Sequence, residues 1–193
     1  CVVTSYGQTA ISNEIYTDQL TPLAKAGTFG DGLTWSIDTA FGGLYIGGSG
    51  AMPDFSGPED CPWAMFRSYV VSITFSRGIT HIGRNAFTGC SRLTRINLPQ
   101  ALESIGAEAF SYCGSLKSLT FPTGLSAIGR GAFAYCGSLQ SISLPFSLRS
   151  IGAGAFEGSA LETVALSDSA SVGERAFADT RLTQLAIPAA GSF

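Results

Sequence analysis

Hydrophobic and polar residues recur along the second half of the chain in one fixed order. A short apolar–polar–apolar segment is followed in most copies by proline, and then by the motif Ile-Gly-x-x-Ala-Phe. The motif begins at Ile82, Ile105, Ile128 and Ile151, so these copies are 23 residues apart, and a fifth begins at Val172 after 21 residues. Such alternation predicts a strand with one buried face. A repeat of roughly 20 to 29 residues predicts a leucine-rich-repeat solenoid.

Each copy carries its large apolar residues at the same offsets, so stacked copies are expected to form continuous columns of side chains. A single copy cannot bury these side chains alone, whereas stacked copies bury them against one another. The predicted core columns contain Phe87, Phe110, Phe133, Phe156, Phe177, Cys90, Cys113, Cys136, Leu93, Leu116 and Leu139. Burying one phenylalanine is worth roughly 1.5–3 kcal/mol. We therefore expect Phe133→Ala to cost about 3–5 kcal/mol.

The remaining repeat positions predict how each coil turns. The proline ends the strand, because it has no N–H to donate to a neighbouring strand. The glycine after the isoleucine, such as Gly129, is expected to allow a backbone turn that a Cβ would strain. The Ala-Phe pair is expected to open a return segment of one helical turn on the opposite side of the coil.

The combined pattern Leu-x-x-Ile-x-Leu-Pro and Ile-Gly-x-x-Ala-Phe-x-x-Cys resembles the BspA-like leucine-rich repeats of bacterial surface proteins. Segments 27–35 and 44–54 resemble the cap that often precedes such repeats. The resemblance covers about residues 27–190 and implies the fold, whereas members of this family differ in role. The expected fold is a β-rich solenoid of leucine-rich repeats of about 23 residues with an N-terminal β-hairpin cap.

The chain is expected to have three parts. These are an N-terminal tether or irregular segment at 1–26, a β cap at 27–69, and a solenoid of about five full repeats at 70–193. In the cap, the alternating segments 33–37 and 44–46 flank a glycine-containing loop, which predicts a β-hairpin. The cap covers the open end of the solenoid core, and Trp35 and Trp63 are the expected covering side chains.

Composition and charge exclude several classes of function. Only 13% of the 193 residues are charged, the net charge is −3, and there is no basic run, so nucleic acid and anionic membranes are poor partners. No apolar run approaches the roughly 20 residues of a membrane-spanning helix. The single His81 is expected on the surface, and the chain has no Cys-x-x-Cys motif and only scattered carboxylates. These features predict no metal site, no cofactor and no enzymatic activity.

The first residue, Cys1, is interpreted as a lipidation site. A chain that begins with cysteine and has no signal peptide before it resembles a mature bacterial lipoprotein, whose N-terminal cysteine is acylated. The alternatives are an arbitrary chain boundary and a Cys1–Cys61 disulfide. Bacteroides-type surface lipoproteins often have acidic residues after the cysteine, and residues 2–5 lack them. Placement at the outer membrane or cell surface therefore follows from the repeat family, with the lipid as the only membrane contact.

The candidate partner contacts lie in three places. They are Leu182, Leu185, Ile187 and Phe193 in the last coil, Trp63 in the cap, and Tyr112 and Tyr135 in two central coils. The last coil has no polar cap, which repeat arrays normally carry, so it is expected to meet another protein. The two tyrosines occupy equivalent repeat positions. They either form an exposed aromatic pair or pack between coils.

The function favoured by these observations is a non-catalytic protein-interaction module in a lipid-anchored envelope protein. Within this class, an accessory subunit of an outer-membrane complex, such as a TonB-dependent nutrient importer, is preferred for a small single domain. The first alternative is an adhesin-like binder of proteins on host or neighbouring cells. The second is glycan binding centred on cap aromatics such as Trp63, Phe66 and Tyr69. A spacer with no ligand is the remaining alternative.

Overall fold

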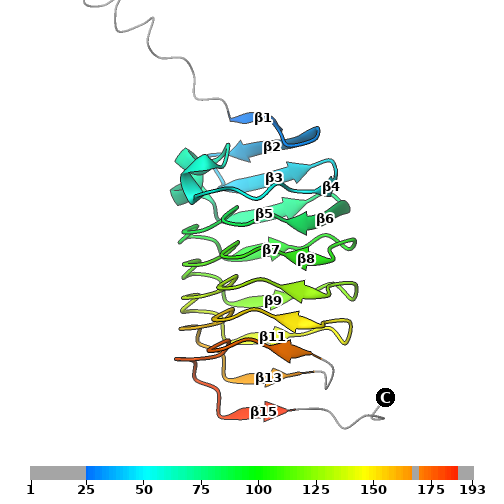
Figure 1. Ribbon diagram of the computed structural model, residues 1–193. Helices are drawn as coiled ribbons and strands as arrows, with labels where there is room; N and C mark the ends of the chain where they lie inside the picture. The colour runs from blue at the N-terminus through cyan, green and yellow to red at the C-terminus, as the bar shows by residue number, and fades with distance from the viewer. Residues whose placement is uncertain (1–24, 167–169, 187–193) are drawn as a thin grey trace, which may run out of the picture.

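The chain folds as a solenoid of coils stacked along one axis (Figure 1). The computed structural model describes residues 25–166 and 170–186. Each repeat adds one short strand to each of two faces, and tight turns connect the strands. The fold is the β-rich leucine-rich-repeat solenoid that the repeat pattern predicts.

The first face contains the strands formed by the apolar–polar–apolar segments, together with the strands of the cap. They are ordered β1-β2-β3-β5-β7 in one sheet and β9-β11-β13-β15 in the next. Their bounds are β1 Ala26–Phe29, β2 Leu33–Asp38, β3 Gly43–Gly47, β5 Ser72–Phe75, β7 Arg95–Asn97, β9 Ser118–Thr120, β11 Ser141–Ser143, β13 Thr163–Ala165 and β15 Gln184–Ala186. Successive repeats pair in parallel and in register, as in Ile142 opposite Leu119. Register is therefore set by the repeat itself.

The second face is a sheet in the order β4-β6-β8-β10-β12-β14. Its strands are short: β4 Ser49–Ala51, β6 Gly78–Ile82, β8 Ser104–Ile105, β10 Ala127–Ile128, β12 Ser150–Ile151 and β14 Ser171–Val172. In β8, β10 and β12 a partly exposed residue precedes a buried isoleucine. These isoleucines begin the Ile-Gly-x-x-Ala-Phe motif, so the motif begins on this face.

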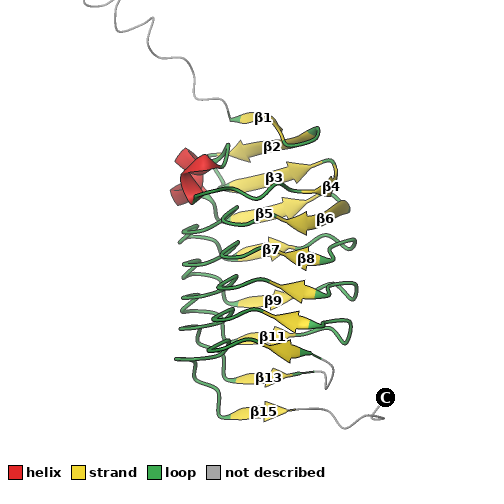
Figure 2. Cartoon of the chain, in the orientation of Figure 1, coloured by secondary structure: helices red, strands yellow, loops and turns green. Residues whose placement is uncertain are grey.

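The cap extends the first face. Strands β2 and β3 form the expected antiparallel hairpin, and β3 pairs in parallel with β5 of the solenoid. An additional strand, β1, pairs antiparallel with β2. The sequence did not indicate β1, because three of its four residues are exposed and it lacks alternation. Two 3₁₀ segments, η1 (Pro58–Asp60) and η2 (Ala64–Tyr69), complete the cap (Figure 2).

The return segment of each coil is a run of tight turns, so the expected helical turn is wrong. Along this segment the backbone N–H groups alternate between two kinds of acceptor. The Phe87 N–H donates to the Ala109 carbonyl of the next coil at 2.8 Å, whereas the Ala86 N–H donates back to Gly83 at 3.4 Å. A helical turn would direct its donors along its own segment. The alternating pattern uses every second donor to hold neighbouring coils together.

The glycine after the isoleucine is required for a different reason from the one expected. Gly129 is not among the residues with positive φ. A Cβ on Gly129 would lie 2.6 Å from the backbone nitrogen of Ala107, and one on Gly152 would lie 2.4 Å from that of Arg130. Neighbouring coils therefore approach each other too closely for any side chain at this position. The constraint is inter-coil packing and not turn strain.

The core consists of the columns that the repeat offsets predict. Adjacent phenylalanine rings from Phe87 to Phe177 stack with centroid separations of 5.2 to 5.4 Å. Trp63 continues this column into the cap, because its ring stacks on Phe87 at 5.4 Å. The cysteine column is buried beside the rings, and the Cys136 thiol donates to the Phe110 carbonyl at 3.3 Å. Residues of the leucine column, Leu93, Leu116 and Leu139, are fully buried.

Candidate binding surfaces

Trp63 lies in the core and cannot offer an exposed ring to a partner. Only 1% of its surface is exposed, and its indole N–H donates to the Ala86 carbonyl at 2.8 Å. Phe66 is also buried, whereas Tyr69 is exposed. The expected roles of Trp63 as a partner contact and as the centre of a glycan platform are therefore wrong. Trp63 takes the place of a phenylalanine at the start of the column. It lies 24 residues before Phe87, close to the 23-residue repeat, and this spacing is the signal in the sequence.

Two of the candidate contact residues in the last coil, Leu182 and Leu185, lie within the described residues. Leu182 is half-buried against the core. Leu185 lies in β15, at a position paired with Val164. Ile187, Phe193 and Cys1 lie outside the described residues.

Three large apolar side chains are exposed in the cap, and two of them, Phe41 and Tyr69, lie where the β2–β3 turn meets the end of η2. Phe41, in the turn between β2 and β3, is 82% exposed; Met65 and Tyr69, near the start and at the end of η2, are 58% and 48% exposed. The Val71 N–H donates to the Gly42 carbonyl at 2.8 Å, so the Phe41 turn lies beside the end of η2 (Figure 2). We call Phe41, Met65 and Tyr69 the cap patch. The sequence pattern does not indicate Phe41 or Met65 as a surface patch, because neither belongs to the repeat.

Tyr112 and Tyr135 form an exposed aromatic pair, which is the first of the two arrangements expected for them. Their rings stack at 4.8 Å with an interplanar angle of 18°, and 57% and 46% of their surfaces are exposed. Both residues have left-handed backbone, with φ of 58° and 59°. Bulky side chains rarely adopt this conformation.

Two hollows adjoin the tyrosine pair and form one groove. One, of about 250 Å³, is bordered by both tyrosines, and a second, of about 370 Å³, extends toward the last coil. They share the lining residues Arg130, Ala153, Gly154 and Glu157. We call this the tyrosine groove. At its far end Arg175 pairs with Glu157 at 2.7 Å and with Asp179 at 3.0 Å. The hydrogen bond from Arg175 lowers the pKa of Glu157.

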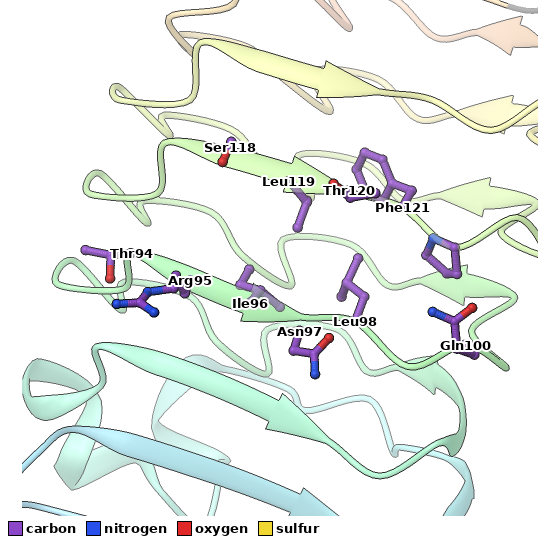
Figure 3. Close-up of a pocket in the computed structure, with 11 residues that line it drawn as sticks. Thr94, Arg95, Ile96, Asn97, Leu98, Gln100, Ser118, Leu119, Thr120 and Phe121 are labelled. Atoms are coloured by element: carbon purple, nitrogen blue, oxygen red, sulfur yellow. The ribbon is translucent and has the colours of Figure 1, made fainter.

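A third hollow lies where the first face is interrupted. Within the described residues, no backbone pairing joins β7 to β9, although both pair with their other neighbours. The opening has a volume of about 370 Å³, and Figure 3 shows Leu98 and Leu119 extending between the two strands. These side chains are buried. Core residues therefore form the floor of the opening, and its rim carries polar side chains such as Arg95, Asn97 and Ser118.

A cluster of three polar side chains beside the second face has the residue types of a Ser-His-Asp catalytic triad. Its members are Ser104, His81 and Asp54. The Ser104 hydroxyl lies 2.8 Å from His81 Nδ1, and Asp54 Oδ1 lies 3.5 Å from His81 Nε2. In a Ser-His-Asp triad the serine contacts Nε2 and a buried aspartate contacts Nδ1, whereas here the nitrogens are exchanged and Asp54 is exposed. The Arg84 N–H donates to Asp54 at 2.6 Å and lowers its pKa. The contacts hold the cap to the first coils. His81 is at the surface, as expected, and is half-buried there by its two partners.

The titratable groups of the core do not assemble into a reactive site. Burial raises the pKa of Cys61, Cys90 and Cys136 to about 12 and raises that of Cys113 well above its usual value. Such thiols are protonated and inert at neutral pH. Residues 25–166 and 170–186 contain no group of three or more His, Cys, Asp or Glu side chains that could hold a metal ion. Over the same residues, no helix is long and apolar enough to cross a membrane.

Comparison with known proteins agrees with this architecture. A leucine-rich repeat protein from Eubacterium ventriosum is 22% identical with a TM-score of 0.74, and the match covers 85% of this chain and 44% of that one. The leucine-rich repeat protein of T. pallidum is 27% identical with a TM-score of 0.53, covering 74% of this chain and 79% of that one. This chain therefore spans less than half of the first structure. No curated protein matches.

The repeats themselves identify the family. The model of the BspA type leucine rich repeat region matches residues 64–189 in six copies. The match begins upstream of Ile82, where the first full copy of the motif starts, and includes the strand β5. Since this model covers more than half of the sequence, the chain belongs to the BspA-type leucine-rich-repeat family.

Proposed function

We propose that this chain is a non-catalytic binding module of the bacterial cell envelope that acts by contact with another protein. Leucine-rich-repeat domains generally mediate protein–protein interaction, and BspA-like members are bacterial surface proteins. The observation that carries the proposal is the cap patch. Exposed apolar clusters mark interaction sites, and aromatic anchors contribute much of the affinity of protein interfaces.

The cap patch is held in place before any partner arrives. The Asp38 carboxylate accepts hydrogen bonds from the N–H groups of Ala40 at 2.8 Å and Phe41 at 3.3 Å. The Arg67 guanidinium donates to the Pro58 carbonyl and so connects η2 to η1. A surface that is already ordered loses little conformational entropy on binding. This rigidity favours docking of a partner onto the patch.

The patch supports an accessory subunit over a free-standing adhesin. It lies at one end of the solenoid, whereas the outward residues of β9 and β11 in the middle of the first face are short and polar, such as Ser118 and Thr120. An exposed apolar patch in the cap suits one fixed contact with one partner. We therefore propose an accessory subunit of an outer-membrane complex, such as a nutrient importer of the TonB-dependent type. An adhesin-like contact with proteins of other cells is the alternative.

Affinity capture from native membranes in mild detergent tests this proposal. The wild-type protein should recover an envelope protein in near-stoichiometric amount, identified by mass spectrometry. The triple variant Phe41→Ser, Met65→Ser, Tyr69→Ser should lose it. The matched control is Val172→Ser, which removes another exposed apolar side chain at the opposite end. If the triple variant recovers as much of the envelope protein as the wild type does, the cap patch is not the contact surface. If the wild type is captured without any envelope protein, an external ligand is favoured.

A further inference from the structure

We propose that the tyrosine groove binds a neutral oligosaccharide of at least two sugar units that lies along the solenoid axis. This inference goes beyond the proposed protein contact, because it concerns a different surface and a different class of ligand. It rests on the shape of the groove, on the two tyrosines along its wall, and on the mixture of donors and acceptors that line it.

The groove exists because two central coils have small residues where their neighbours have large ones. Gly131 and Gly154 occupy the repeat position that Glu108 fills in the preceding coil and Arg175 fills in the last. The glycines line its floor, and the two charged residues stand at its ends. The two hollows, of about 250 and 370 Å³, are adjacent and share four lining residues. Two adjacent hollows of this size can hold two consecutive sugar rings.

The wall of the groove holds its tyrosines at positions where the fold prefers glycine. The equivalent residues in the coils on either side are Gly89 and Gly158, and all four positions have positive φ. A Cβ on Gly158 would lie 2.7 Å from Tyr135 Cδ1, so the Tyr135 ring extends over this glycine toward the next coil. Tyr112 stacks on Tyr135. The result is a stacked, exposed pair of aromatic rings that spans neighbouring coils, and burial does not account for it.

The charges around the groove favour an uncharged ligand. Three carboxylates and two guanidinium groups line the two hollows, from Glu108, Glu157, Glu174, Arg130 and Arg175. An anion would meet the carboxylates and a cation would meet the arginines. A sugar hydroxyl both donates and accepts hydrogen bonds, so it can use both kinds of group. Arg130 and Glu108 form no ion pair with any described residue, and they remain available to a ligand.

Isothermal titration calorimetry with purified protein tests the inference. The probes are neutral hexasaccharides of glucose, xylose and mannose in their common linkages, with oligogalacturonate and chitosan oligomers as charged comparisons. We expect saturable binding of at least one neutral probe, weaker binding of the matching monosaccharide, and no tighter binding of a charged probe. The double variant Tyr112→Gly, Tyr135→Gly should bind roughly tenfold more weakly or worse.

The glycine substitutions suit this test, because the backbone at both positions is one that glycine adopts freely. The double variant should therefore fold, and thermal unfolding checks that it does. Phe41→Ser, which removes an exposed ring from the cap patch, is the matched control and should bind the probe normally. The inference is overturned if no neutral probe binds, if a charged probe binds more tightly, or if the double variant retains wild-type affinity.

Discussion

Phe133→Ala should destabilise the solenoid more than the same change at the end of the phenylalanine column. Phe133 is fully buried and stacks on Phe110 at 5.3 Å and on Phe156 at 5.4 Å, while Phe121 meets it edge-on at 5.7 Å. Removal of a buried phenylalanine side chain costs about 3–5 kcal/mol, and each aromatic pair adds about 0.5–1.5 kcal/mol beyond its buried area. Because Phe133→Ala removes three aromatic pairs, we expect its cost in unfolding free energy near the upper end of the range for buried phenylalanines, at about 4–5 kcal/mol.

The matched comparison is Phe177→Ala. Phe177 is only partly buried, and its described ring contact is with Phe156 at 5.4 Å. Its loss should cost about 1–3 kcal/mol.

Urea denaturation followed by circular dichroism measures both costs, provided that the dependence of the unfolding free energy on urea concentration is unchanged. A domain of this size has a total stability of roughly 5–15 kcal/mol, so both losses are measurable. Equal costs for the two variants, or a cost below about 2 kcal/mol for Phe133→Ala, would refute the view that stacked rings hold the coils together.

Three further predictions concern the close packing between coils. Among the described residues, Ser159 alone has a buried side-chain hydroxyl without a partner, at the position where Cys136 donates to a carbonyl. Ser159→Cys should therefore raise the unfolding free energy by about 1 kcal/mol in urea titrations, and a lower unfolding free energy than the wild type would contradict this. Gly129→Ala should cost at least about 2 kcal/mol in the same assay, because its Cβ meets backbone atoms at 2.6 Å; a neutral effect would show that the coils can separate. Alkylation with iodoacetamide at pH 8, read by peptide mapping, should label Cys61, Cys90, Cys113 and Cys136 only after unfolding, and rapid native labelling of any of them would disprove their burial.

The repeat period was sufficient to predict the coil and its core. Residues such as Phe133 and Cys136 recur at fixed offsets, and one physical requirement, burial against the neighbouring coil, determines each of them. The period does not state how the turns close. The repeat pattern therefore predicts backbone strain as the reason for Gly129, whereas the structure shows close approach between coils.

The candidate surfaces were less predictable, because they depend on residues that vary between copies. The direction of a side chain at Tyr112 depends on a left-handed backbone conformation, and the repeat pattern does not report φ. The cap patch depends on a contact between the Phe41 turn and the end of η2, which lie in segments outside the repeat. The His81 contact with Asp54 likewise joins the cap to the first coils. Such contacts between unlike segments leave no periodic signal.

The most direct test of the account compares three proteins in one capture experiment from native membranes. These are the wild type, the cap-patch triple variant, and the Tyr112→Gly, Tyr135→Gly double variant. The account predicts that the wild type and the tyrosine variant recover the same envelope protein in near-stoichiometric amount, and that the cap-patch variant loses it. Recovery of that protein by the cap-patch variant, or of no protein by the wild type, would contradict the claim that this solenoid acts through a protein partner at its capped end.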